Sequence, residues 1–196
     1  MFTKQLSLKG SSAYVLKDVS KVSLFVFLLS ISAHVRVYLP YSPVPLTFET
    51  LVLFISPLFL GRMAFFAVGG WVLLGLFGIP VFAGGKGFVF FLGPSGGYVV
   101  GFLFAALVLP GFLSISRGFL KQTAVLAAAN VLIYITGVAG LMLSLKISFV
   151  QSVIIGVVPF IYGDILKIVL ASLALKTAAF KKGNPLRDKT FPRAGV

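Results

Sequence analysis

An acidic and a basic side chain stand three residues apart in the otherwise apolar sequence VPFIYGDILKIVLAS. This spacing lies on one face of a helix, so the Asp164 carboxylate and the Lys167 ammonium can neutralise each other. A charge at bilayer depth costs on the order of 2.5–3.5 kcal/mol, and paired intramembrane charges normally face a cavity. A structural ion pair and a polar floor for a bound ligand are both open interpretations. Pro159 and Gly163 predict a break just upstream, which leaves Asp164 near a helix N-terminus on the outer half of the membrane, where the helix dipole favours a carboxylate.

A glycine-rich, aromatic segment, GLFGIPVFAGGKGFVFFLGPSGGYVVGF, supplies a second group of candidate residues. Gly84 and Gly85 permit a close approach of the backbone to a ligand. Phe82, Phe90 and Tyr98 are suited to form apolar walls around a small ring system. The alternative is an interfacial loop carrying aromatic belt residues. The pattern G-x-x-x-x-G-K-[ST] is absent, so a phosphate-binding loop is not expected.

The third candidate segment is PYSPVPLTFET, where prolines at 40, 43 and 45 predict a stiff, extended loop that loses little entropy on binding. We include Tyr41 of this loop among the expected ligand contacts. Glu49 begins the next helix, either as an N-terminal charge favoured by the dipole or as a ligand contact. For His34 and Arg36, which close the preceding helix, interfacial roles are the favoured interpretation.

The elements that must position these residues are apolar helices. Of the 196 residues, 59% are hydrophobic and only 11% are charged, against roughly 25% charged in soluble domains. Lipid can solvate the outer faces of such helices, so we expect an all-α integral membrane protein with six transmembrane helices. The expected spans lie at about 22–37, 50–60 (or from Leu46), 63–77, 98–113, 123–143 and within 149–175.

The basic residues predict the orientation in the membrane. Of 17 Lys and Arg residues, Lys167 lies within a span and three (Arg36, Lys86 and Lys146) lie on one side, which leaves 13 on the other. By the positive-inside rule, both termini are expected in the cytoplasm, and the proline-rich and glycine-rich loops outside. We therefore divide the chain into a basic N-terminal segment (1–21) with a short surface helix, a substrate-binding membrane domain (22–175) and a basic tail (176–196).

Several classes of function are disfavoured by composition. The net charge of +13 is explained by the positive-inside rule, so nucleic-acid binding is not expected. The absence of Cys excludes thiol chemistry, and a single His excludes an all-histidine metal centre within one chain. No metal or cofactor is expected. An enzyme is disfavoured because a single buried acid–base pair offers few catalytic groups.

Four ordered motifs, PVPLTFE, GIPVFAGG, GPSGGYVVGF and YGDILK, resemble the BioY family, the biotin-binding S-components of energy-coupling factor (ECF) transporters. The resemblance covers about residues 32–174. It implies a six-helix fold that holds biotin near the outer surface, with Asp164, Lys167 and the loop from Gly84 to Gly97 at the site. It also implies transport at the cell membrane with an ECF module of two ATPases and a transmembrane coupling subunit.

Two positions depart from the family pattern. Glu49 stands where the family usually has Gln, and residues 22–37 lack the A-x-x-x-A pattern with which S-components dock on their partner. Biotin's ureido N–H groups suit Asp164, while Lys167 can donate to the ureido carbonyl or the tail carboxylate, so the sequence leaves the orientation of biotin open. An S-component for another small vitamin is the main alternative, and an intramembrane enzyme a weaker one.

Overall fold

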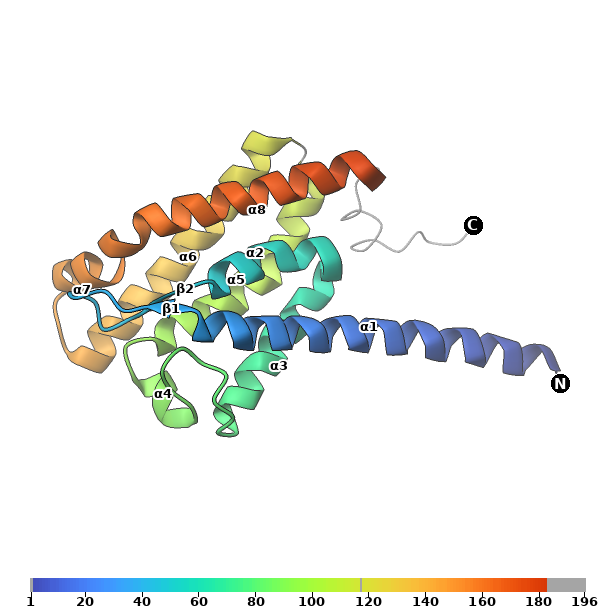
Figure 1. The fold of residues 1–196 in the computed structure, drawn as a ribbon, viewed down its shortest axis with the longest axis horizontal. Helices are drawn as coiled ribbons and strands as arrows, with labels where there is room; N and C mark the ends of the chain where they lie inside the picture. The colour runs from blue at the N-terminus through green and yellow to red at the C-terminus, as the bar shows by residue number, and fades with distance from the viewer. Residues whose placement is uncertain (1, 117, 183–196) are drawn as a thin grey trace.

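The protein is a bundle of helices, described by a computed structural model over residues 2–116 and 118–182 (Figure 1). The elements in order are α1 (Phe2–His34), β1 (Arg36–Val37), β2 (Leu46–Thr47), α2 (Glu49–Leu60), η1 (Gly61–Met63), α3 (Ala64–Leu76), α4 (Phe88–Leu92), α5 (Gly96–Ile115), α6 (Phe119–Leu145), α7 (Phe149–Gly156), η2 (Val158–Phe160) and α8 (Ile161–Lys182). Figure 1 shows the start of α1 and the end of α8 at one end of the bundle, and β1, β2 and α7 at the opposite end.

Four helical stretches of the described chain are long and apolar enough to cross a membrane: Glu49–Leu76, Gly96–Ile115, Phe119–Leu145 and Phe149–Ala178. This confirms the predicted all-helical membrane fold, whereas the count of six spans stays a prediction. The first stretch joins α2, η1 and α3, and the chain turns at Gly61, whose φ is 57°. With 12 and 13 residues, α2 and α3 are each only about 20 Å long, short of the roughly 30 Å hydrocarbon core.

Helix α1 is continuous from Phe2 to His34, where the sequence predicted a surface helix followed by a separate span. No Pro or Gly interrupts residues 11–34, so nothing ends the helix at the expected boundary. Its described side chains include the charged Lys17, Asp18 and Lys21, and α1 is not among the four apolar stretches. Of the predicted basic tail, residues 183–196 lie outside the described residues.

Two structures at the end of the bundle opposite the start of α1 were not predicted (Figure 1). Strands β1 and β2 form a short antiparallel ribbon, in which Arg36 lies opposite Thr47 and Val37 opposite Leu46. The glycine-rich loop contains the single-turn helix α4 and is tied to α3, because Trp71 Nε1 donates to the Val81 carbonyl at 3.0 Å. The ribbon and this loop are therefore held against the bundle.

Helices α5 and α6 pack closely enough that their backbones touch. A Cβ atom added at Gly97 would collide with the backbone of Thr136 and Gly140, and one at Gly101 with the backbone of Ile133. Small residues are the usual means by which membrane helices approach so closely. Residues of both helices line the cavity described below, so this close contact fixes two of its walls relative to each other.

Candidate ligand-binding site

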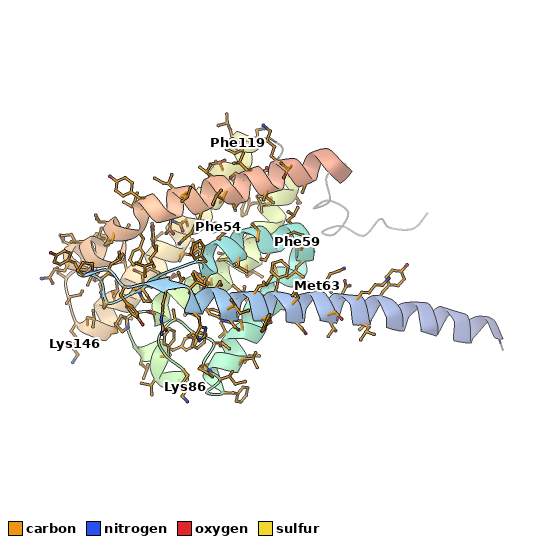
Figure 2. All side chains as sticks on the ribbon, viewed as in Figure 1. Phe54, Phe59, Met63, Lys86, Phe119 and Lys146 are labelled. Carbon is orange, nitrogen blue, oxygen red and sulfur yellow. The ribbon has the colours of Figure 1, made fainter. Side chains whose placement is uncertain are left out.

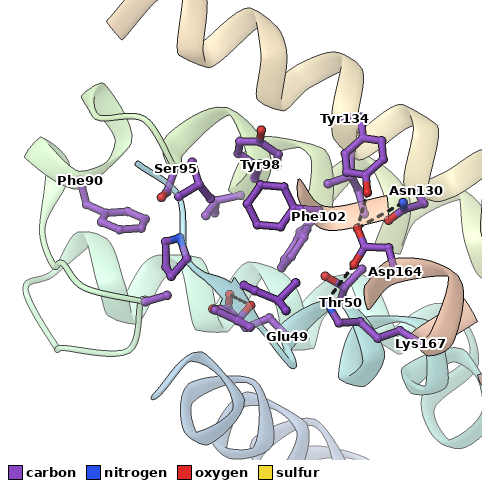
Figure 3. Close-up of a pocket in the computed structure, with 18 residues that line it drawn as sticks. Glu49, Thr50, Phe90, Ser95, Tyr98, Phe102, Asn130, Tyr134, Asp164 and Lys167 are labelled. Carbon is purple, nitrogen blue, oxygen red and sulfur yellow. Dashed lines mark hydrogen bonds and ion pairs between the residues drawn. The ribbon is translucent and has the colours of Figure 1, made fainter. Parts of the chain in front are cut away.

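A cavity of about 590 Å³, counting the open space at its mouth, lies among β2, α2, α5, α6 and α8. Figure 3 shows its lining side chains converging from these elements and from Phe90 of α4. Its polar lining residues are Thr47, Glu49, Thr50, Ser95, Tyr98, Asn130, Tyr134, Asp164 and Lys167.

Asp164 is the centre of the cavity's polar network. Its Oδ1 accepts from Lys167 Nζ at 2.8 Å, and its Oδ2 accepts from the Tyr134 hydroxyl at 2.6 Å and from Asn130 Nδ2 at 3.4 Å (Figure 3). Asp164 and Lys167 are each only 6% exposed. As predicted, Asp164 occupies the first turn of the last helix, because Pro159 in η2 ends the preceding helical segment. The carboxylate is thus fixed in place by three donors.

The cavity contains a second carboxylate, that of Glu49. It is the first residue of α2, is 7% exposed, and its Oε2 accepts from the Thr47 hydroxyl at 2.8 Å. No described basic side chain lies within ion-pair distance of it. Glu49 therefore lines the cavity, which favours the ligand-contact interpretation over a purely dipole-related role.

Asn130 and Tyr134 were missed in the sequence analysis. They lie four residues apart on α6, hence on one face, and both point toward Asp164. The Asn130 Oδ1 atom is buried without a hydrogen-bond partner in the described chain. The position of Asn130 in the middle of an apolar span could have identified it as a candidate, since polar residues are rare within membrane helices and usually functional.

The apolar part of the lining is aromatic. Phe90 stacks on Phe82, with ring centroids 4.6 Å apart and planes at 17°, and Phe82 meets Trp71 edge-on at 4.9 Å. Phe102 and Phe160 line the cavity from other elements. Flat aromatic walls beside a polar floor suit a small ligand with one apolar and one hydrogen-bonding face.

Of the predicted site residues, Asp164, Lys167, Phe90 and Tyr98 line the cavity. The other four are placed as follows: Phe82 is 2% exposed behind Phe90, Gly84 adopts a φ of 92°, Gly85 leaves room that the Phe90 ring occupies, and Tyr41 is 85% exposed outside the lining.

Tyr98 is held by its own contacts as well as facing the cavity. Its hydroxyl donates to the Gly156 carbonyl at 2.6 Å, and its ring lies where a Cβ of Gly137 would be. The hydroxyl thereby joins α5 to the end of α7, two residues before η2. Tyr98 supports the position of the segment that leads into Asp164.

The lining of the cavity suits a ligand that carries a polar group without net charge next to an apolar ring. Two carboxylates, one ammonium, one amide and two phenols can pair with N–H donors and a carbonyl acceptor. Among the described residues, no group of three or more His, Cys, Asp or Glu could hold a metal ion. Fold and cavity together define a helical membrane protein with a cavity suited to a small molecule near one end of its bundle.

The chain matches the BioY family over residues 3–182 and belongs to this family, which confirms the resemblance seen in its motifs. It is 36% identical over 170 residues to "Probable biotin transporter BioY" of Pyrococcus horikoshii, covering 86% of this chain and 98% of the relative. It is 34% identical to "Biotin transporter BioY" of Thermotoga maritima, covering 81% and 93%. With its apolar helices, the protein is a multi-pass protein of the cell membrane.

The fold matches that of a solved S-component for biotin from an ECF-type ABC transporter, with a TM-score of 0.80. The match covers 89% of this chain and 97% of the other, at 23% sequence identity. The likeness at this identity is one of fold, and it extends over nearly the whole bundle.

Proposed function

We propose that this protein binds biotin in the outer cavity and acts as the substrate-binding subunit of a biotin uptake system. The observation that carries the proposal is the buried Asp164 carboxylate, held by Lys167 and Tyr134 at the floor of an aromatic-walled cavity. The names of its relatives, which are transporters and not enzymes, support the same role. The predicted orientation would open the cavity to the outside of the cell.

Biotin has two ureido N–H donors, a ureido carbonyl, an apolar thiophane ring and a carboxylated tail. The N–H groups suit the carboxylates of Asp164 and Glu49, and the carbonyl suits Lys167. Each charge-assisted hydrogen bond is worth roughly 1.5–3 kcal/mol. Two of them and a bicycle buried against Phe90 and Phe102 are sufficient for nanomolar binding, about −12 kcal/mol.

Uptake against a gradient requires energy, and the sequence has no phosphate-binding loop. We therefore propose that an ECF module of two ATPases and a transmembrane coupling subunit supplies it. The solved protein with the matching fold is described as an S-component of such a transporter, which supports this part of the proposal.

Isothermal titration calorimetry of the detergent-purified protein with a panel of vitamins tests the function. We expect nanomolar binding of biotin and no saturable binding of thiamine, riboflavin or pantothenate. Tight binding of another member of the panel, with none of biotin, would favour the alternative of an S-component for a different vitamin. The isolated protein should hydrolyse no ATP with or without biotin.

A further inference from the structure

The charges inside the cavity leave the tail carboxylate of biotin without a partner. Asp164 and Glu49 line the same cavity as Lys167, whose ammonium is already 2.8 Å from Asp164 Oδ1. A third carboxylate beside these two would be repelled, since like charges at close range oppose each other. The tail is therefore expected to point toward the mouth, and a cation at the mouth is needed to bind it.

The β-ribbon places Arg36 directly beside a residue that lines the cavity. Arg36 lies directly opposite Thr47 in the antiparallel register, and directly opposed residues project from the same face of a ribbon. Thr47 lines the cavity and is 8% exposed, whereas Arg36 is exposed. Thr47 thus belongs to the buried wall of the cavity, and Arg36 lies next to it at the solvent-accessible edge.

A second contact places the guanidinium of Arg36 beside the glycine-rich loop. An ideal Cβ at Gly84 would lie 3.6 Å from Arg36 Nη1 and 3.5 Å from the Tyr38 hydroxyl. Gly84 follows Ala83, which lines the cavity. The guanidinium therefore lies where the ribbon meets the loop, with a phenol O–H next to it.

The Arg36 side chain contacts an aromatic ring and has no anionic partner among the described residues. Its Cζ lies 5.5 Å from the centroid of the Tyr38 ring, a cation–π contact that leaves the N–H donors available. The ion pairs within the described residues are Lys21–Asp18 and Lys167–Asp164. Figure 2 shows the two other outer basic residues, Lys86 and Lys146, pointing away from the body of the protein.

We propose that Arg36 binds the tail carboxylate of biotin and so selects the free acid over tail-modified derivatives. The inference rests on the proposed function, and it means that the carboxylated tail of biotin lies beside the β1–β2 ribbon. A guanidinium matches a carboxylate with two parallel N–H···O bonds, a geometry that favours Arg over Lys.

The test compares biotin with biotinamide, which keeps the bicycle and replaces the carboxylate with a neutral amide. Calorimetry on wild-type protein at low ionic strength should show a preference for biotin of about threefold to tenfold, as expected for an ion pair at a solvent-accessible edge. Arg36→Gln should abolish the preference and leave the affinity for biotinamide unchanged. Arg36→Lys should retain part of the preference. Lys86→Gln and Lys146→Gln, which remove the same charge nearby, should retain all of it.

Unchanged biotinamide binding by Arg36→Gln shows an intact cavity, so the result does not depend on stability. The wild-type preference should also shrink between 0.05 and 0.5 M salt, because an exposed pair is screened. The inference is overturned if Arg36→Gln still prefers biotin, or if the wild type does not distinguish the two ligands. Failure of both ligands to bind wild-type protein would instead overturn the proposed function.

Discussion

Replacing Asp164 with Asn is the sharpest test of whether the buried pair binds ligand or only stabilises the bundle. The substitution keeps the shape of the side chain and its ability to accept from Tyr134 at 2.6 Å. It removes the charge that Lys167 Nζ contacts at 2.8 Å and turns an N–H group toward that ammonium. If Asp164 accepts from a biotin N–H, affinity should fall by about 1.5–3 kcal/mol, or roughly tenfold to more than a hundredfold.

The same change has a cost in stability that must be separated from binding. Lys167 is 6% exposed, so in Asp164→Asn it becomes a buried charge without its partner, which costs about 3–5 kcal/mol. Lys167→Met likewise leaves Asp164 as a buried charge without its partner, and it should destabilise the protein by a similar amount. In the double variant Asp164→Asn, Lys167→Met no lone charge remains, so thermal stability in detergent should largely recover.

Biotin calorimetry on the folded double variant then decides between the two roles. A binding role predicts recovered stability with affinity still reduced at least tenfold. Near-native affinity would refute the reasoning and make the pair structural. Asp18→Asn is the matched control, because Asp18 and Lys21 are also three residues apart and form an ion pair with an N···O distance of 3.1 Å. Their side chains are 41% and 50% exposed, so this pair lies in solvent and not in the cavity. That variant should bind biotin normally and change stability by less than about 1 kcal/mol.

Three further predictions concern α6 and the glycines of the bundle. Tyr134→Phe removes a hydroxyl donor from the cavity carboxylate and should weaken biotin binding about tenfold in calorimetry while the protein stays folded. Gly137→Ala puts a methyl group into the space occupied by the Tyr98 ring and should lower the unfolding free energy by about 1–3 kcal/mol in a thermal assay. Gly111→Ala is the control: an added Cβ there has no atom within 4 Å, so this variant should not be destabilised. Lys146→Cys should react with an impermeant maleimide on intact cells and Lys121→Cys at the other end of the same helix should not; the reverse pattern would contradict an outward-facing cavity.

Local signals in the sequence were sufficient to predict where the main helices begin near the site. Pro159 and Gly163 predicted the break near the start of α8, and the span expected from about residue 98 lies within α5, which begins at Gly96. The spacing of Asp164 and Lys167 predicted their pairing, because both residues belong to one helix. Each of these features depends on neighbours within a few residues.

The remaining features depend on contacts between segments far apart in the chain. Strands of two residues have no readable alternation, so the pairing of Arg36 with Thr47 follows from the way the bundle brings the ribbon together. Asn130 and Tyr134 join the site because α6 packs beside α8, 30 to 34 residues away in sequence. The exposed position of Tyr41 reflects the path of the proline-rich loop, which proline spacing alone does not determine.

The short separation of Asp164 and Lys167 also has a consequence for the biogenesis of the protein. Their bond spans three residues of α8, so it can form as soon as that helix does, before any neighbouring helix has assembled. The apolar part of the nascent helix that contains Asp164 and Lys167, residues 161–175, then enters the bilayer with no net charge. An acid that relied on a cation from another helix would enter the bilayer as a bare charge, at an insertion cost of about 2.5–3.5 kcal/mol. The last helix therefore carries the counter-charge for Asp164 within its own sequence, and the contacts with Asn130 and Tyr134 can form later, when α6 packs beside it.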